Sequence, residues 1–248
     1  RDVLGSRGLG DVYKRQTGPR GRLTCGIYAA GTHRVLPYTD CLLQDTVINQ
    51  TIAAVLEAAR ACRWPAFEED RGTGLLRHVL VRRGKTSGQV LVVLVTAQEN
   101  LPGSRNFVKA LREKAPWVTS VVQNCNPRRT SAVLGSDVRT LYGPGKITDT
   151  LCGLQFAISP RSFYQVNPEQ TEVLYAKAIE ESNGKTLYGI GNSSRGKTAG
   201  ASFIEMLQKI DPNYTGTIEW SQPKNNSIFT TLNADIKSAN HIYSMTLI

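Results

Sequence analysis

One run of six consecutive apolar residues limits the folds open to this chain. The residues from Val90 to Val95 read V-L-V-V-L-V, and they follow a glycine-bounded turn, Gly84 to Gly88. A strand that is apolar on both faces belongs in the middle of a sheet. The preceding segment, Leu75 to Arg82, is also typical of a strand, so the two predict a hairpin across the turn.

The segments around this hairpin predict an α+β domain built on a mainly antiparallel sheet. Apolar residues recur with helical spacing from about Gln44 to Cys62, and a second helix is expected from Ser104 to Lys114. Short strand candidates make up the rest of the domain, at 23–28, 33–36, 117–123, 131–134, 139–141, 147–151 and 154–158.

The charge balance favours a polyanionic partner. The chain carries a net charge of +10 and has a pI of about 9.5, which is typical of proteins that bind nucleic acid. A solvated basic face without a partner is the alternative. The basic residues concentrate at Arg77, Arg82, Arg83, Lys85, Arg128, Arg129 and Arg161.

Cysteine usage and hydropathy predict a reducing, cytoplasmic location. The five cysteines are widely spaced and odd in number, which argues for reduced thiols instead of a disulfide framework. No apolar run reaches membrane-spanning length, and no segment is typical of a secretory signal peptide.

One segment combines an arginine, an aromatic residue and an amide just before a helix start. Arg161, Phe163 and Gln165 alternate after a predicted strand. Asn167 suits the N-cap of the following helix, and Pro168 suits its first position. Such a trio would suit a pocket for an unstacked base. The alternative is an ordinary strand-to-helix connection with Phe163 in the core.

The stretch from Ser159 to Pro168 resembles the F-x-Q-x-N segment of the RNA uracil-5-methyltransferases. Further matches lie upstream in the same order, at 25–28, 31–37, 41–44, 74–82, 121–124 and 129–130. The resemblance covers about residues 20 to 181 and is closest to the branch that modifies 23S ribosomal RNA. It implies an enzyme that uses S-adenosylmethionine to methylate uridine.

The resemblance also implies roles for individual residues. Gln165 would reach the S-adenosylmethionine site, Phe163 would pack near the extruded uridine, and Asn167 would mainly hold the helix start. The implied partner is ribosomal RNA, not DNA or a membrane, and the implied state is a monomer. The residues expected to bind the RNA are Phe163, Arg161, Asn167, Arg82 and Arg129.

Cys41 matches the last cysteine of a four-cysteine iron–sulfur site found in many members of that family. A 4Fe–4S cluster needs four thiolates, and the other three would lie before Thr17. The chain instead carries Arg1 to Gln16, which has no clear period and is interpreted as a non-native or disordered segment. A natural basic arm that touches RNA is the alternative. We therefore expect no cluster to assemble here.

The chain changes character near Ser182. In the family, the helix ending near Glu181 leads into a Rossmann-like methyltransferase domain, and residues 183–191 begin in that manner. The acidic residue and the Cys-Gly pair of the family's cofactor loop are missing, and no cysteine follows Cys152. The chemistry needs a thiolate to attack the uracil ring and a base to remove the ring proton. The resemblance thus implies a fragment without the catalytic domain, inactive by itself.

Two other patterns occur in the tail. Gly191 to Thr198 satisfies the P-loop pattern G-x-x-x-x-G-K-S/T, between a predicted strand at 186–190 and a predicted helix at 199–210. Stretches within 185–193, 203–208 and 231–236 resemble the C-terminal lobe of NAD-dependent sugar epimerases and dehydratases. The predicted organisation is a foreign segment at 1–16, an RNA-facing domain at 17–181, and an unrelated or chimeric α/β tail at 182–248.

Overall fold

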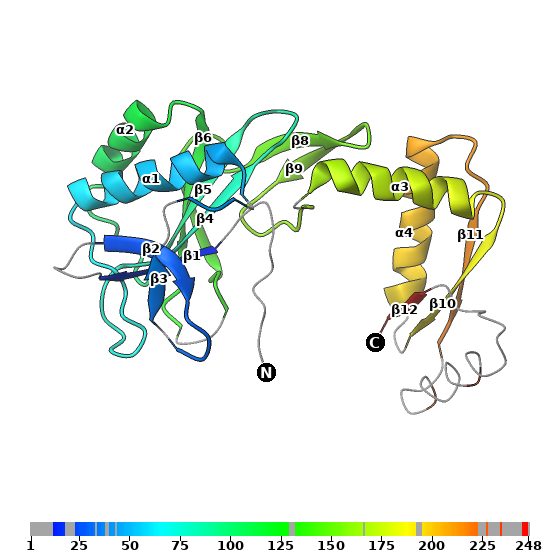
Figure 1. Ribbon diagram of the computed structural model, residues 1–248, viewed down its shortest axis with the longest axis horizontal. Coiled ribbons are helices and arrows are strands. Elements are labelled where there is room, and N and C mark those ends of the chain that lie inside the picture. Colours follow the sequence, from blue (N-terminus) through cyan, green and yellow to red (C-terminus); the bar gives the residue numbers. More distant parts are fainter. Residues whose placement is uncertain are drawn as a thin grey trace. The chain divides into compact units, whose positions relative to one another are not determined.

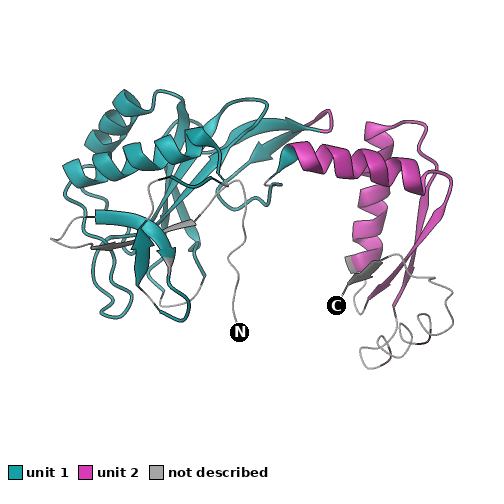
Figure 2. Cartoon of the chain, viewed as in Figure 1, with its two compact units in different colours: residues 1–151, 155–168 teal, residues 152–154, 169–248 magenta. Residues whose placement is uncertain are grey.

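The computed structural model describes most of the 248-residue chain. The described residues are 12–17, 23–32, 34–37, 40–42, 44–128, 132–165, 167–191, 195–222, 227, 234 and 245–247. The chain divides into two compact units (Figure 2). Unit 1 contains residues 1–151 and 155–168, and unit 2 contains residues 152–154 and 169–248.

Unit 1 is built on a seven-stranded sheet with the order β3-β2-β1-β4-β5-β6-β7 (Figure 1). Neighbouring strands are antiparallel except β5 and β6, which are parallel and are connected through α2 (Ser104–Lys114). The sheet is thus mainly antiparallel, as the sequence predicted. Its strands are β1 (Val12–Thr17), β2 (Leu23–Tyr28), β3 (Val35–Pro37), β4 (Leu76–Arg83), β5 (Val90–Thr96), β6 (Val118–Cys125) and β7 (Asp137–Tyr142).

The apolar run that predicted a central strand lies in β5. All seven residues of β5 are fully buried, and β5 pairs with β4 on one side and β6 on the other. The helices α1 (Thr46–Ala61) and α2 cover one face of the sheet (Figure 1). Asp45 caps α1 by accepting a hydrogen bond from the backbone N–H of Val47 at 2.8 Å.

The structure corrects the interpretation of the first residues. The sequence predicted no regular element in 1–16, but Val12–Thr17 forms β1, between β2 and β4. Lys14, for example, is opposite Gly26 in β2 and His78 in β4. Because both edges of β1 find hydrogen-bond partners, pairing imposes the extended backbone where the side-chain pattern is weak. Residues 1–11 lie outside the described residues.

A separate two-stranded sheet consists of β8 (Ile147–Leu151) and β9 (Leu154–Ile158). The strand predicted at 131–134 is wrong for 132–134, which form a loop; residue 131 is not described. The side chain of Asn126 donates hydrogen bonds to the carbonyls of Ala132 at 2.8 Å and Val133 at 3.1 Å. These carbonyls therefore have partners without a neighbouring strand.

Unit 2 is a small parallel α/β arrangement. Its helices are α3 (Pro168–Ser182), which begins at the predicted proline, and α4 (Arg195–Ile210). Its strands β10 (Thr186–Gly191), β11 (Thr217–Ser221) and β12 (Met245–Leu247) have the order β11-β10-β12 and are parallel. None of the described helices is long and apolar enough to cross a membrane.

Candidate nucleic-acid interface

The predicted arginine–aromatic segment forms a tight turn after β9. The hydroxyls of Ser159 and Ser162 lie 2.9 Å apart, and the backbone N–H of Ser162 donates to the Ser159 carbonyl at 3.2 Å. Pro160, inside the turn, is buried, whereas Arg161 is exposed. The turn thus has an anchored inner side and presents its arginine outward.

Two arginines from different elements hold this turn through backbone carbonyls. Arg82 of β4 donates from Nη2 to the Pro160 carbonyl at 3.3 Å, and Arg161 donates from Nη2 to the Gly135 carbonyl. The Nε of Arg82 is buried and has no hydrogen-bond partner among the described residues. Burial lowers the pKa of Arg82. Within the described parts of the chain, neither guanidinium pairs with a carboxylate.

A buried asparagine fixes the carbonyl that Arg161 contacts. Asn124 is fully buried; its side chain accepts from the N–H of Gly135 at 2.7 Å and donates to the Gly135 carbonyl at 3.1 Å. A Cβ at Gly135 would lie 1.9 Å from the carbonyl oxygen of Cys125, so only glycine fits this approach. Asn124 and Gly135 together therefore position Arg161.

A buried carboxylate anchors the other end of the segment. Asp149 of β8 is 1% exposed and accepts a hydrogen bond from the hydroxyl of Tyr164 at 2.9 Å. It also accepts from three consecutive backbone N–H groups in the turn between β4 and β5. Asp149 and Tyr164 were not predicted from the sequence. The sequence signal that could have indicated Asp149 is its position in β8, where it lies on the same face of the strand as the buried Ile147 and Leu151.

Between these anchors, Phe163 is 82% exposed. The alternative that placed Phe163 in the core is therefore wrong. Gln165 is half-buried, and Asn167 is exposed directly before α3. The segment therefore combines an exposed aromatic ring with two arginines that form no ion pair with a described carboxylate, which makes it a candidate ligand site. We call Arg82, Arg161, Phe163 and Gln165 the turn site.

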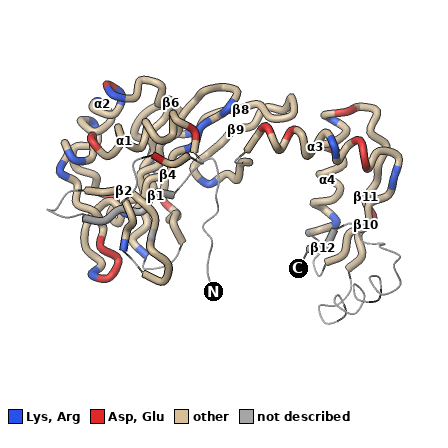
Figure 3. Tube along the Cα trace, viewed as in Figure 1, with Lys and Arg blue, Asp and Glu red and all other residues tan. Residues whose placement is uncertain are grey.

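Two other arginines of the basic clusters, Arg77 and Arg83, pair with carboxylates and are not available to a ligand. Arg77 is 3% exposed and pairs with Glu69 at 2.9 Å, so its place among the basic residues that could follow a phosphate backbone is wrong. Arg83 pairs with Asp45. Basic and acidic positions are both spread along the described trace of unit 1 (Figure 3). Arg129 lies outside the described residues.

The cysteines form no metal site within the described residues, where no three His, Cys, Asp or Glu side chains gather to hold a metal ion. Cys41 is half-buried, and its carbonyl accepts from the side chain of Asn49 at 3.2 Å. Cys125 is buried; burial, with smaller effects of Glu99 and Asp137, raises the pKa of its thiol. A raised pKa leaves little thiolate at neutral pH, which fits a structural role for Cys125.

A second candidate site lies at the carboxyl end of β10 in unit 2. After β10 the chain crosses through α4 to β11 on one side, and β12 returns to the other side. Ligands of open parallel sheets bind at such a reversal, outside the carboxyl ends of the strands. The P-loop pattern begins here at Gly191, and Lys197 is exposed in the first turn of α4. Residues 192–194 of that pattern are not described.

Packing explains one glycine of this pattern. A Cβ at Gly196 would lie 2.0 Å from Cζ2 of Trp220, so the close contact between α4 and β11 requires glycine at this position. The presence of glycine at position 196 is therefore explained by helix–strand packing, without invoking phosphate binding.

The chain is similar in sequence to RNA methyltransferases, although no protein-family model matches it. It is 41% identical over 163 residues to an uncharacterized RNA methyltransferase of Halalkalibacterium halodurans, covering 66% of this chain and 36% of that protein. It is 36% identical over 192 residues to one of Caldanaerobacter subterraneus, covering 75% and 42%. The chain thus spans about two fifths of the length of these relatives. The second match is longer than segment 17–181, so part of it lies outside that segment.

The fold is similar to that of the tRNA (uracil-54, C5)-methyltransferase of Pyrococcus abyssi, solved in complex with S-adenosyl-L-homocysteine. The TM-score is 0.62 at 16% identity, over 97% of this chain and 55% of that one. The likeness therefore extends into unit 2 and shows a shared mixed α/β fold. The origin of residues 182–248 and the seam near Ser182 stay predictions.

Proposed function

We propose that this chain is part of an RNA methyltransferase and that its turn site binds RNA. One observation carries the proposal: Arg82 and Arg161 contact backbone carbonyls and no carboxylate among the described residues, close to the exposed Phe163. Arginine pairs with phosphate through charge-assisted hydrogen bonds. Exposed aromatic rings stack on bases that are not already stacked, so the site suits a single-stranded or looped RNA.

We further propose ribosomal RNA as the substrate, C5 of a uracil in 23S RNA as the position modified, and a monomer as the acting form. The support is the colinear resemblance of residues 20–181 to the enzymes of that branch and the sequence relatives named RNA methyltransferases. A transfer RNA is the rival substrate, because the solved neighbour acts on one.

The proposed cofactor is S-adenosylmethionine, with Gln165 as the residue of the turn site that contacts it. The support is the position of Gln165 in the F-x-Q-x-N segment and its half-buried amide, which has no hydrogen bond to other described residues. When bound, the cofactor supplies the methyl group. Gln165 would orient it through the donor and acceptor of one carboxamide.

We propose that the catalytic cysteine and base are not supplied by this chain. Three of the five described cysteines, Cys62, Cys125 and Cys152, have thiol pKa values raised by burial, which is the opposite of an activated nucleophile. The purified chain should transfer no methyl group from labelled S-adenosylmethionine to a uridine-containing RNA. Labelled 5-methyluridine in the RNA would overturn this part of the proposal.

The RNA-binding proposal is tested by fluorescence anisotropy with a looped 23S RNA fragment and a transfer RNA. Arg82→Ala and Arg161→Ala should each weaken binding and reduce the slope of log K against log salt by about 0.7. Phe163→Ala should weaken binding to the loop, because base stacking contributes about 1–3 kcal/mol. The control is Arg105→Ala, which removes an exposed arginine of α2. Equal losses in all four variants would contradict a specific site.

A second candidate function rests on the carboxyl end of β10. The strand reversal there and the P-loop pattern favour a ligand with a phosphate or nucleotide moiety. ATP would then raise the melting temperature of the chain, and Lys197→Ala would remove the effect. An epimerase or dehydratase fragment is the other reading of the tail, and UDP-sugars would replace ATP as the stabilising ligand.

A further inference from the structure

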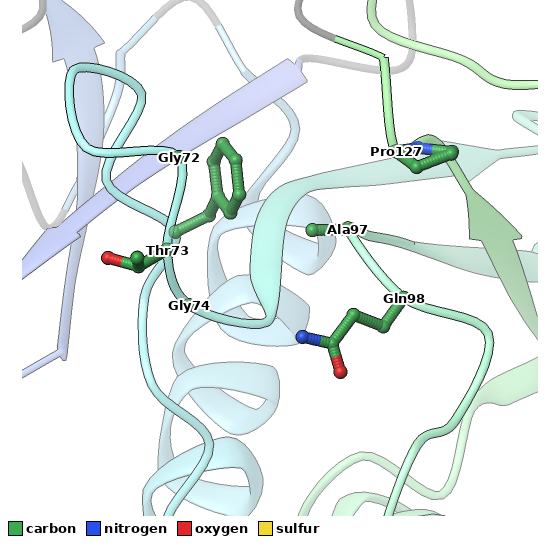
Figure 4. Close-up of a pocket in the computed structure, with 7 residues that line it drawn as sticks. Gly72, Thr73, Gly74, Ala97, Gln98 and Pro127 are labelled. Atoms are coloured by element: carbon green, nitrogen blue, oxygen red, sulfur yellow. The ribbon is translucent and has the colours of Figure 1, made fainter.

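Unit 1 contains a cavity that shares no residue with the turn site. Its volume is about 270 Å³, and it lies between three segments: Phe67 with Gly72 to Gly74, the residues Ala97 and Gln98 after β5, and Pro127 (Figure 4). Sites for drug-sized ligands usually measure roughly 300–1,000 Å³. This cavity is therefore suited to one small group and not to a whole cofactor.

Arg77 joins two of the three walls. Its Nε and Nη2 donate to the carboxylate of Glu69 at 2.9–3.2 Å, and its guanidinium carbon lies 4.7 Å from the ring centroid of Phe67. Its Nη1 donates to the carbonyls of Asn126 at 2.8 Å and Arg128 at 2.7 Å, on either side of Pro127. All donors of this buried side chain are thus used to hold the cavity's walls.

A buried glutamine fixes the third wall. Gln123 of β6 is 2% exposed, and its Nε2 donates to the carbonyls of Gln98 at 3.1 Å and Glu99 at 3.0 Å. The loop with Phe67 is also constrained: Gly74 has a φ of 111°, and a Cβ there would lie 2.1 Å from the carbonyl oxygen of Ala66. The cavity is therefore preformed, which lowers the entropic cost of filling it.

The lining selects for an uncharged, flat group with polar edges. All seven lining residues are uncharged, so neither a phosphate nor an ammonium group would be compensated inside. Phe67 and Pro127 supply apolar surface. The exposed Gln98 extends toward the Gly72–Gly74 segment (Figure 4), and its carboxamide makes no hydrogen bond to other described residues. It therefore offers one donor and one acceptor side by side, which match the edge of a nucleobase.

A cation stands next to this uncharged cavity. Arg128 follows Pro127 directly and is exposed, and its side chain forms no ion pair within the described residues. A base inside the cavity would carry its phosphate outside, where a guanidinium stabilises it. The arrangement of an uncharged pocket beside an arginine fits a nucleotide better than a free sugar or an acidic peptide.

We propose that this cavity binds one unstacked base of a single-stranded RNA, with Gln98 reading the base edge and Arg128 holding the adjacent phosphate. The site deepens the proposed function, because it would give the RNA a second point of attachment in unit 1. It rests on the proposal that unit 1 binds RNA. The experiments below can refute base binding in the cavity without refuting RNA binding by the turn site.

The test uses the full chain with AMP, GMP, CMP, UMP and ribose 5-phosphate as ligands, observed by nuclear magnetic resonance. At least one nucleotide should shift the side-chain amide of Gln98 and receive saturation from protein onto its base protons. Ribose 5-phosphate should do neither at the same concentration. If ribose 5-phosphate shifts Gln98 as much as the nucleotides do, or if no base receives saturation, the base-binding proposal is wrong.

Two variants complete the test. Gln98→Leu keeps the side chain's size and should weaken nucleotide binding about 5-fold, the loss of a neutral hydrogen bond of about 1 kcal/mol. The matched control is Gln208→Leu, an exposed glutamine of α4, which should have no effect. With the looped RNA, Gln98→Leu should weaken binding in the wild-type and in the Arg161→Ala background. If only Arg82→Ala and Arg161→Ala weaken RNA binding, the cavity proposal fails and the turn site stands.

Discussion

Among the residues that hold the turn site in place, Asp149 should be the one whose substitution lowers stability most. Its Oδ1 accepts from the N–H groups of Thr86 at 3.0 Å and Ser87 at 2.9 Å. Its Oδ2 accepts from the N–H of Lys85 at 2.8 Å and from the Tyr164 hydroxyl at 2.9 Å. One carboxylate thus connects the β4–β5 turn to Tyr164, the residue after Phe163. Three consecutive backbone N–H groups of that turn donate to this carboxylate.

The cost of losing this carboxylate follows from its four donors. In Asp149→Asn, the remaining side-chain oxygen still accepts from the N–H groups of Thr86 and Ser87. The new NH2 group replaces the oxygen that accepted from the N–H of Lys85, so that N–H loses its acceptor. The Tyr164 hydroxyl can rotate and accept a hydrogen bond from the new NH2 group. An unsatisfied donor costs about 1–3 kcal/mol, and bonds to a charged acceptor exceed those to a neutral one by about 1 kcal/mol. We expect Asp149→Asn to lose about 2 kcal/mol of stability. Asp149→Ala removes the acceptor of all four donors and should lose about 3–4 kcal/mol of stability. The loss is no larger because water can replace part of the lost hydrogen bonds at the exposed turn.

Hydrogen exchange of the backbone amides in the β4–β5 turn tests this prediction. A local loss of about 2 kcal/mol speeds exchange of the Lys85, Thr86 and Ser87 amides about 30-fold. Asp137→Asn, at an exposed aspartate of β7, is the control and should leave these amides unchanged. In a double-mutant cycle, Tyr164→Phe should cost less in the Asp149→Ala background than in the wild type. Wild-type exchange in Asp149→Ala would refute the reasoning.

Three further outcomes are expected. Gly135→Ala should lower the urea midpoint, since its Cβ would lie 1.9 Å from the Cys125 carbonyl oxygen, and should weaken RNA binding through Arg161; an unchanged midpoint would show that the loop yields freely. Because burial raises the pKa of the Cys62 and Cys152 thiols above the usual value, less thiolate is present at a given pH than in free cysteine. Iodoacetamide should therefore label both at pH 8 more slowly than free cysteine, and faster labelling would contradict the burial. Leu174 of α3 is 65% exposed, so Leu174→Ser should change the free energy of unfolding in urea by less than about 0.5 kcal/mol, and a larger loss would show that this side chain is buried.

The sequence predicted the elements whose signals are local. The β4–β5 hairpin, α2 and the start of α3 at Pro168 all follow from periodicity, a glycine-bounded turn or a cap. β1 could not be predicted in this way, because its extended backbone comes from pairing with two strands that are distant in sequence. The burial of Asp149 was not predicted; the alternation in β8 could have indicated it, but not that its partners would be Tyr164 and the turn of another hairpin.

The arginines of β4 show why a count of charges is a weak guide to a binding site. Arg82 and Arg83 are neighbours, and successive side chains of a strand point to opposite faces of the sheet. Arg83 shares its face with Val79 and Val81, in the core under α1, and there pairs with Asp45, the residue that caps that helix. Arg82 lies on the other face, where its partner is the Pro160 carbonyl in the turn after β9 and where no described carboxylate pairs with it. The residue that caps the helix therefore neutralises Arg83, whereas Arg82, on the opposite face, contacts the turn that contains Arg161 and Phe163.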